Sequence, residues 1–132
     1  MADKCQGPGS PMDWLRHAQS DLHLASIPPP ENVLLEGLCF HAQQAAEKAI
    51  KAVLIHYRIE FPRTHNIGTL LDLLPESLSL PQELEETTIL TDYAVITRYP
   101  GDIEAVEIEE YQQAIFLAQT IVSWAEKELF KS

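Results

Sequence analysis

The sequence has few basic residues, few cysteines and no long apolar run. Nine Lys and Arg stand against 20 Asp and Glu, and the formal net charge of −11 argues against a protein that coats nucleic acid non-specifically. The two cysteines, Cys5 and Cys39, form neither a disulfide framework nor a CxxC pair, and we interpret Cys39 as a small buried hydrophobe. No stretch approaches the ~18 apolar residues of a membrane span, and the N-terminus lacks the apolar segment of a signal peptide. We therefore expect a cytoplasmic protein that does not contact membranes.

The common catalytic and metal-binding motifs are missing too. A di-iron site in a helical bundle needs Glu-x-x-His on two helices, and this motif does not occur. The sequence also lacks His-Glu-x-x-His, a glycine-rich phosphate loop, Gly-x-Ser-x-Gly, and Cys and His pairs at zinc spacing. Because these motifs depend on local spacing, the sequence shows their absence directly. It therefore predicts no metal site and no cofactor.

The pattern of apolar residues indicates an all-helical chain. Its 132 residues suffice for one domain, and no strand alternation or internal repeat occurs. We expect residues 1–9 to be a disordered leader and residues 10–131 to form a single helical domain. The predicted fold class is all-α, an antiparallel bundle of four long helices plus a short crossing helix.

Capping and helix-breaking residues set the expected boundaries. The first helix begins at Ser10 and Pro11. Three consecutive prolines at 28–30 end it. The second helix runs from about 31 to about 58, and Thr64 caps the short helix. The third long helix begins at Gln82 and ends before Pro100. The last long helix runs from about Ile103 to about Lys131.

A row of polar side chains on the second helix is the candidate site. His41, Gln44, Lys48 and Lys51 recur there at helical spacing. His65 follows the end of that helix, and Arg98 and Tyr99 lie at the end of the helix that begins at Gln82. Lys and Arg can bind phosphate oxygens, Gln can bind a base or a ribose, and Tyr can stack on a base. A histidine near an arginine could also transfer a proton during metal-independent phosphodiester cleavage. The candidate nucleotide-binding or RNA-binding residues are therefore His41, Gln44, Lys48, Lys51, His65, Arg98 and Tyr99.

Ordinary structural roles explain several of these residues equally well. Glu47 and Lys51 form an i, i+4 pair in the favourable order, which suits an exposed helix face. His65 could simply hydrogen-bond at the start of the short helix, and Arg98 suits the negative end of its helix dipole. A purely structural adaptor is a further alternative, in which a partner binds an apolar surface made of Phe40, Leu54, Leu117, Ile121 and Trp124.

Three segments taken together resemble one known family. "HAQQAAEKAIKAVL", "THNIGTLLDLL" and "TRYPG", followed by a long amphipathic helix, are similar to the HEPN domain family over residues 12–129. The resemblance implies a helical bundle that is commonly a homodimer. It also implies a nucleotide or RNA ligand and, as partner, a small nucleotidyltransferase of the toxin–antitoxin or stress-defence type.

One feature of that family is not found in its usual place. Many members are metal-independent RNases that use an Arg-x4-6-His motif near the start of the final long helix. The final helix of this sequence contains neither Arg nor His. Arg58 and His65 have the right spacing, but they span the loop after the second helix, and we interpret this as coincidence. The catalytic residues of any RNase activity therefore stay unassigned, and a binding module is the leading hypothesis.

Overall fold

The computed structural model describes residues 9–28, 31, 34–78 and 107–130, and these residues form helices and no strands. This confirms the predicted all-α class. The helices are α1 (Pro11–Ser26), α2 (Leu35–His56), α3 (Ile67–Asp72) and α5 (Ile108–Leu129). The predicted long helix from Gln82 to the residues before Pro100 lies outside the described residues, as do residues 1–8 of the predicted leader.

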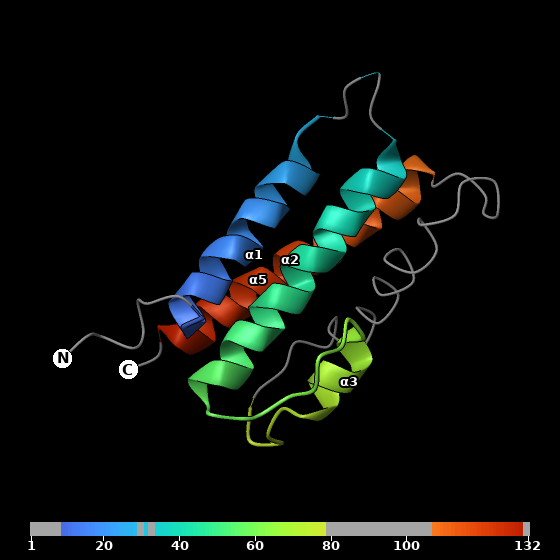
Figure 1. Cartoon of the computed structure of the whole chain (residues 1–132). Coiled ribbons are helices and arrows are strands. Elements are labelled where there is room, and N and C mark those ends of the chain that lie inside the picture. The colour runs from blue at the N-terminus through green and yellow to red at the C-terminus, as the bar shows by residue number, and fades with distance from the viewer. Residues whose placement is uncertain (1–8, 29–30, 32–33, 79–106, 131–132) are drawn as a thin grey trace.

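The three long helices pack side by side, with α1 antiparallel to both α2 and α5 (Figure 1). The short helix α3 packs beside the C-terminal half of α2, after the chain has turned at the end of that helix (Figure 1). α2 contacts every other described helix, and it therefore forms the centre of the fold. None of the described helices is both long enough and apolar enough to cross a membrane.

Helix α1 begins as the sequence predicts. The Ser10 hydroxyl accepts a hydrogen bond from the Asp13 amide at 3.1 Å, and Pro11 occupies the first turn, where its missing N–H costs nothing. The Asp13 carboxylate accepts from the Gly9 amide at 3.0 Å and from Arg16 at 2.8 Å. The Gly9 hydrogen bond, followed by the Arg16 hydrogen bond, holds the pKa of the Asp13 carboxyl below its usual value. The negative charge of Asp13 in turn stabilises the positive end of the helix dipole.

Three predicted helix starts are wrong by a few residues. Helix α5 begins at Ile108 rather than at about Ile103, because its N-cap Glu107 has an extended backbone. Helix α2 begins at Leu35 rather than near 31, because Leu34 has an extended backbone and its carbonyl accepts the first hydrogen bond, from the Gly37 amide at 3.1 Å. Asn66, not Thr64, caps α3, since its side chain accepts from the Thr69 amide at 3.1 Å. Thr64 instead accepts from the Asn66 amide at 3.0 Å, which fixes the turn before the helix. Because Asn and Thr are both good N-cap residues, residue type alone did not distinguish the two positions.

Small residues of α2 allow the helices to approach closely. Ala42, Ala46 and Ala49 are fully buried, and their short side chains keep the neighbouring helices close to α2. At the far end of the bundle the Tyr111 hydroxyl of α5 donates to the Ala25 carbonyl of α1 at 2.5 Å, and burial raises the pKa of this phenol. This bond ties the start of α5 to the last turn of α1.

The prediction that a structural adaptor would bind its partner through this apolar surface is wrong. Leu54, Leu117 and Ile121 are completely buried, and Trp124 is 5% exposed. These side chains belong to the core because α5 packs against both α1 and α2, so a wide arc of the helix is covered. Phe40, the remaining member of that set, is half-buried.

The Cys39 thiol should be unreactive in the folded protein. Cys39 is completely buried, and this burial, with smaller contributions from Glu36 and Glu110, raises the pKa of the thiol to about 12. In a Cys5→Ser variant, we expect Ellman's reagent in mildly alkaline buffer to modify Cys39 only as fast as the chain unfolds. The same variant in guanidinium should react at once and serves as the control. Rapid reaction in native buffer would contradict the burial of this thiol.

Candidate functional site

The predicted polar row lies on one side of α2, at residues 41, 44, 48 and 51, but it does not face open solvent. Lys51 is 7% exposed, and the other members are half-buried. The interpretation of Glu47 and Lys51 as an exposed surface pair is therefore wrong. The pair does form, with Lys51 Nζ 2.9 Å from Glu47 Oε2, but the two side chains are only 9% and 3% exposed. Packing of α1 and of the loop after α2 covers this part of the helix.

Asp21 of α1 binds two members of the row. Its carboxylate lies 2.7 Å from Lys48 Nζ and 3.2 Å from His41 Nδ1. His41 and Lys48 are two helical turns apart on α2, so both can reach a single carboxylate on the neighbouring helix. Because a carboxylate only accepts, Asp21 favours the tautomer with the proton on His41 Nδ1. This orients the imidazole, whose side chain stays 39% exposed.

Glu47 collects three donors at the middle of α2. In addition to Lys51, the Gln43 amide donates to Glu47 Oε1 at 2.8 Å. His65 Nδ1 lies 3.0 and 3.2 Å from the two Glu47 oxygens. Gln44 joins the network by donating to the Gln43 carbonyl oxygen at 2.9 Å. The buried Glu47 carboxylate is thus fully compensated, as a charge in a protein interior must be.

His65 lies before α3 and also contacts Glu47 of α2. The contact with Glu47 ties the loop that follows α2 back to the centre of that helix. The same loop contributes Phe61, whose ring centroid is 5.7 Å from Lys51 Nζ. Trp14 of α1 approaches the same ammonium group, with its centroid 5.6 Å from Nζ. Lys51 therefore links α1, α2 and the loop through two cation–π contacts and an ion pair.

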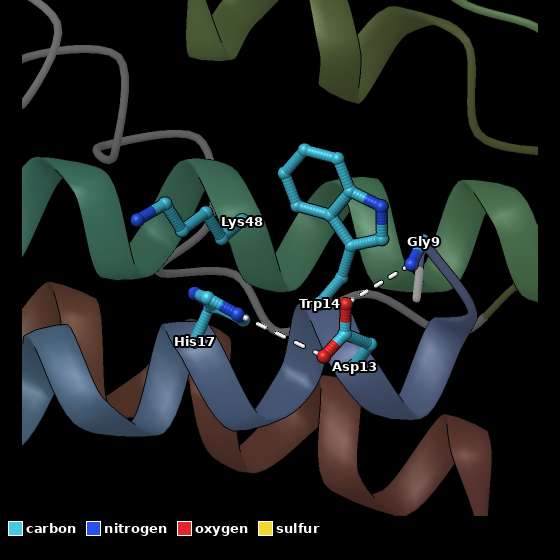
Figure 2. Close-up of a pocket in the computed structure, with 5 residues that line it drawn as sticks. All are labelled: Gly9, Asp13, Trp14, His17 and Lys48. Atoms are coloured by element: carbon cyan, nitrogen blue, oxygen red, sulfur yellow. Dashed lines mark hydrogen bonds and ion pairs between the residues drawn. The ribbon is translucent and has the colours of Figure 1, made fainter. Parts of the chain in front are cut away.

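A pocket of about 320 Å³ opens beside Trp14 between α1 and α2. Figure 2 shows the Trp14 indole rising from α1 across α2, with Lys48 and His17 to one side of it and Asp13 and Gly9 to the other. His17 Nε2 is 3.7 Å from Asp13 Oδ1, and the His17 side chain is 61% exposed. The pocket thus combines an aromatic ring, one lysine, one histidine and the Asp13 carboxylate within a protein of strongly negative net charge.

Sequence reasoning found only part of this arrangement. The structure brings His41 and Lys48 together through Asp21, and Gln44, Lys51 and His65 together through Glu47 and Gln43. Arg98 and Tyr99 lie outside the described residues. Among the residues that the structure describes, no group of three potential ligands could hold a metal ion. The side chains from α1 that sequence reasoning missed are Asp13, Trp14, His17 and Asp21.

A sequence signal for these α1 side chains does exist. Trp14, His17 and Asp21 recur at steps of three and four and therefore lie on one side of α1. By its spacing alone, Trp14 fits the apolar face of this helix equally well. Only the packing of α1 on α2 shows that its indole ring lies beside the polar row.

Removing one charge of the Glu47–Lys51 pair should destabilise the fold more than removing both. Glu47→Ala leaves a buried ammonium group without its counter-charge, so we expect the free energy of unfolding in urea to fall by about 3–5 kcal/mol. Glu47→Gln combined with Lys51→Met removes both charges and keeps an acceptor for the buried Gln43 amide, so this variant should lie closer to wild-type stability than Glu47→Ala does. Arg16→Ala, which breaks a pair whose Arg side chain is 71% exposed, is the control and should change stability far less. An effect of Glu47→Ala no larger than that of the control would show that water reaches the pair.

Comparison with known proteins gives a family for this geometry. The model of the HEPN domain matches residues 11–129. No curated protein matches the sequence. Among solved structures, the chain is similar to TT1696 from Thermus thermophilus, with 32% sequence identity and a TM-score of 0.74 over 90% of this chain and 98% of that chain. A family match over nearly the whole chain, together with the all-helical structure, shows that this protein belongs to the HEPN domain family.

Proposed function

We propose that this HEPN-fold chain is a cytoplasmic module that binds a nucleotide in the pocket between α1 and α2. The observation that carries the proposal is the convergence of Trp14, His17 and Lys48 on one pocket. An indole ring can stack on any nucleotide base, and a lysine and a histidine can hydrogen-bond to a phosphate group. A volume of about 320 Å³ falls at the lower end of the range for small-molecule sites.

The neighbouring polar row supports this assignment. Asp21 fixes the position of Lys48 through their 2.7 Å contact, so less side-chain entropy is lost when a phosphate binds. His41 and Gln44 extend the polar surface along α2, where they could reach a ribose or a base edge. The net charge of −11 disfavours a long nucleic acid more than a single nucleotide, because repulsion accumulates with every phosphate.

The proposal extends to protein partners. The family resemblance supports a homodimer and a small nucleotidyltransferase partner in a toxin–antitoxin or stress-defence setting. The HEPN-fold chain and such a nucleotidyltransferase would then both bind a nucleotide. Homodimer, nucleotidyltransferase partner and nucleotide are separate parts of the proposal, and the nucleotide and the homodimer are tested by separate experiments.

Calorimetric titration tests the nucleotide part. ATP and a short single-stranded RNA should be titrated with and without magnesium into the wild type, Trp14→Leu, Lys48→Ala and Arg98→Ala. We expect ATP to bind, and we expect Trp14→Leu and Lys48→Ala each to weaken binding about tenfold or more, because stacking and the phosphate contact are lost.

Arg63→Ala is the matched control, since it removes an exposed positive charge that does not line the pocket. Lys48→Arg keeps the charge and should retain most of the affinity. Circular dichroism should show that each variant is folded, because Lys48→Ala also removes the ammonium partner of the Asp21 carboxylate and leaves it only the His41 contact. Equal loss of affinity in Arg63→Ala and Lys48→Ala would mean that diffuse charge, not the pocket, binds the ligand.

A metal-independent RNase is the second candidate, and the Asp21–His41 contact favours it. A carboxylate that holds Nδ1 of an imidazole prepares Nε2 to act as a base, as in hydrolases with a catalytic triad. Cleavage of RNA in EDTA should then be lost in His41→Ala and in Arg98→Ala and reduced in Asp21→Asn. His23→Ala, on the last turn of α1, is the control. Unchanged cleavage in His41→Ala and Arg98→Ala would assign the activity to other residues or to a contaminant.

A further inference from the structure

The solvent side of α5 carries a stripe that is uncharged between Glu109 at one end and Lys127 at the other, in a strongly acidic protein. Residues 111–125 contain no Asp, Glu, Lys or Arg, although the net charge of the chain is −11. The stripe consists of positions that recur at steps of four, three, four, three and four, the spacing of a helix-packing seam. All of these side chains are exposed except Thr120, which is partly buried, and they are Glu109, Gln113, Phe116, Thr120, Ser123 and Lys127.

This stripe lies opposite the core face of the same helix. Tyr111, Ala118, Val122 and Ala125 point into the bundle and are buried, whereas Phe116 is 54% exposed. The Thr120 hydroxyl donates to the Phe116 carbonyl at 2.9 Å, so its hydrogen bond is made within the helix. Covering Thr120 would therefore leave no unsatisfied donor. An exposed aromatic residue among uncharged polar residues has the composition of the core of a protein–protein interface.

We propose that the stripe binds the α5 stripe of a second copy of this chain, with the two helices antiparallel. This rests on the homodimer part of the proposed function and is independent of the nucleotide pocket. Two copies that each carry a net charge of −11 repel one another, and an uncharged helix face lowers that repulsion at close contact. An uncharged partner would not require opposite charges at the two ends of the stripe, where Glu109 and Lys127 lie.

The charges at the two ends of the stripe specify the antiparallel orientation. Glu109 lies in the first turn of α5 and Lys127 in the last turn. A two-fold axis near residue 118 places Glu109 of each copy opposite Lys127 of the other. The same register pairs residue 113 with 123 and residue 116 with 120, so every position of the stripe meets another position of the stripe. A parallel pair would instead place Glu109 against Glu109 and Lys127 against Lys127.

Sedimentation equilibrium with charge-reversal variants tests this interface. We expect a dimer at micromolar concentration in about 0.15 M salt, which screens the long-range repulsion between the two acidic chains, and we expect Phe116→Gln to raise its dissociation constant at least about tenfold. Glu109→Lys and Lys127→Glu should each raise it about tenfold or more, because each creates two like-charge contacts per dimer. The combined variant Glu109→Lys/Lys127→Glu restores opposite charges and should return the constant close to that of the wild type.

The controls separate this interface from the rest of the proposed function. Arg16→Glu reverses an exposed charge on α1, outside the stripe, and should leave the dissociation constant unchanged. Phe116→Gln should retain the ATP affinity of the wild type, since Phe116 does not line the pocket. A monomeric wild type overturns both the homodimer and this interface. A dimer that is insensitive to Phe116→Gln, or that the combined variant does not restore, overturns this interface alone and leaves the homodimer in place.

Discussion

The buried carboxylate of Glu47 is the constraint on which the arrangement around α2 depends. A charge that is 3% exposed is stable only where donors surround it, and Glu47 obtains them from Gln43, Lys51 and His65. These donors come from α2 itself and from the loop that follows it. The loop is therefore held against the helix by a specific ion-pair network as well as by apolar packing.

Close packing of α1 on α2 produces the second polar centre. Fully buried alanines along α2, such as Ala42 and Ala49, leave room for α1 to approach. This approach brings the Asp21 carboxylate to 2.7 Å from Lys48 and the Trp14 ring to 5.6 Å from Lys51. The same packing that excludes water from the core thus assembles the pocket wall from two helices. The pocket is a consequence of helix geometry and not of a dedicated loop.

Three features follow from the sequence alone, namely the helical class, the cap of α1 and the burial of Cys39. Each of these depends on residues that are close in sequence, such as Ser10 with Asp13, or on a period that repeats along one helix. The segments "HAQQAAEKAIKAVL" and "THNIGTLLDLL" likewise indicated the family, because they are contiguous. Local order was enough for these conclusions.

The contacts of the polar row, by contrast, depend on how the helices and the loop pack together. A helical wheel places His41, Gln44, Lys48 and Lys51 on one side of α2, but it cannot show what covers that side. The Asp21 contact comes from another helix, and the His65 contact comes from a loop 18 residues away from Glu47. For the same reason the wheel could not distinguish the buried Glu47–Lys51 pair from an exposed one. Burial and partner choice depend on residues distant in sequence, and folding alone brings them together.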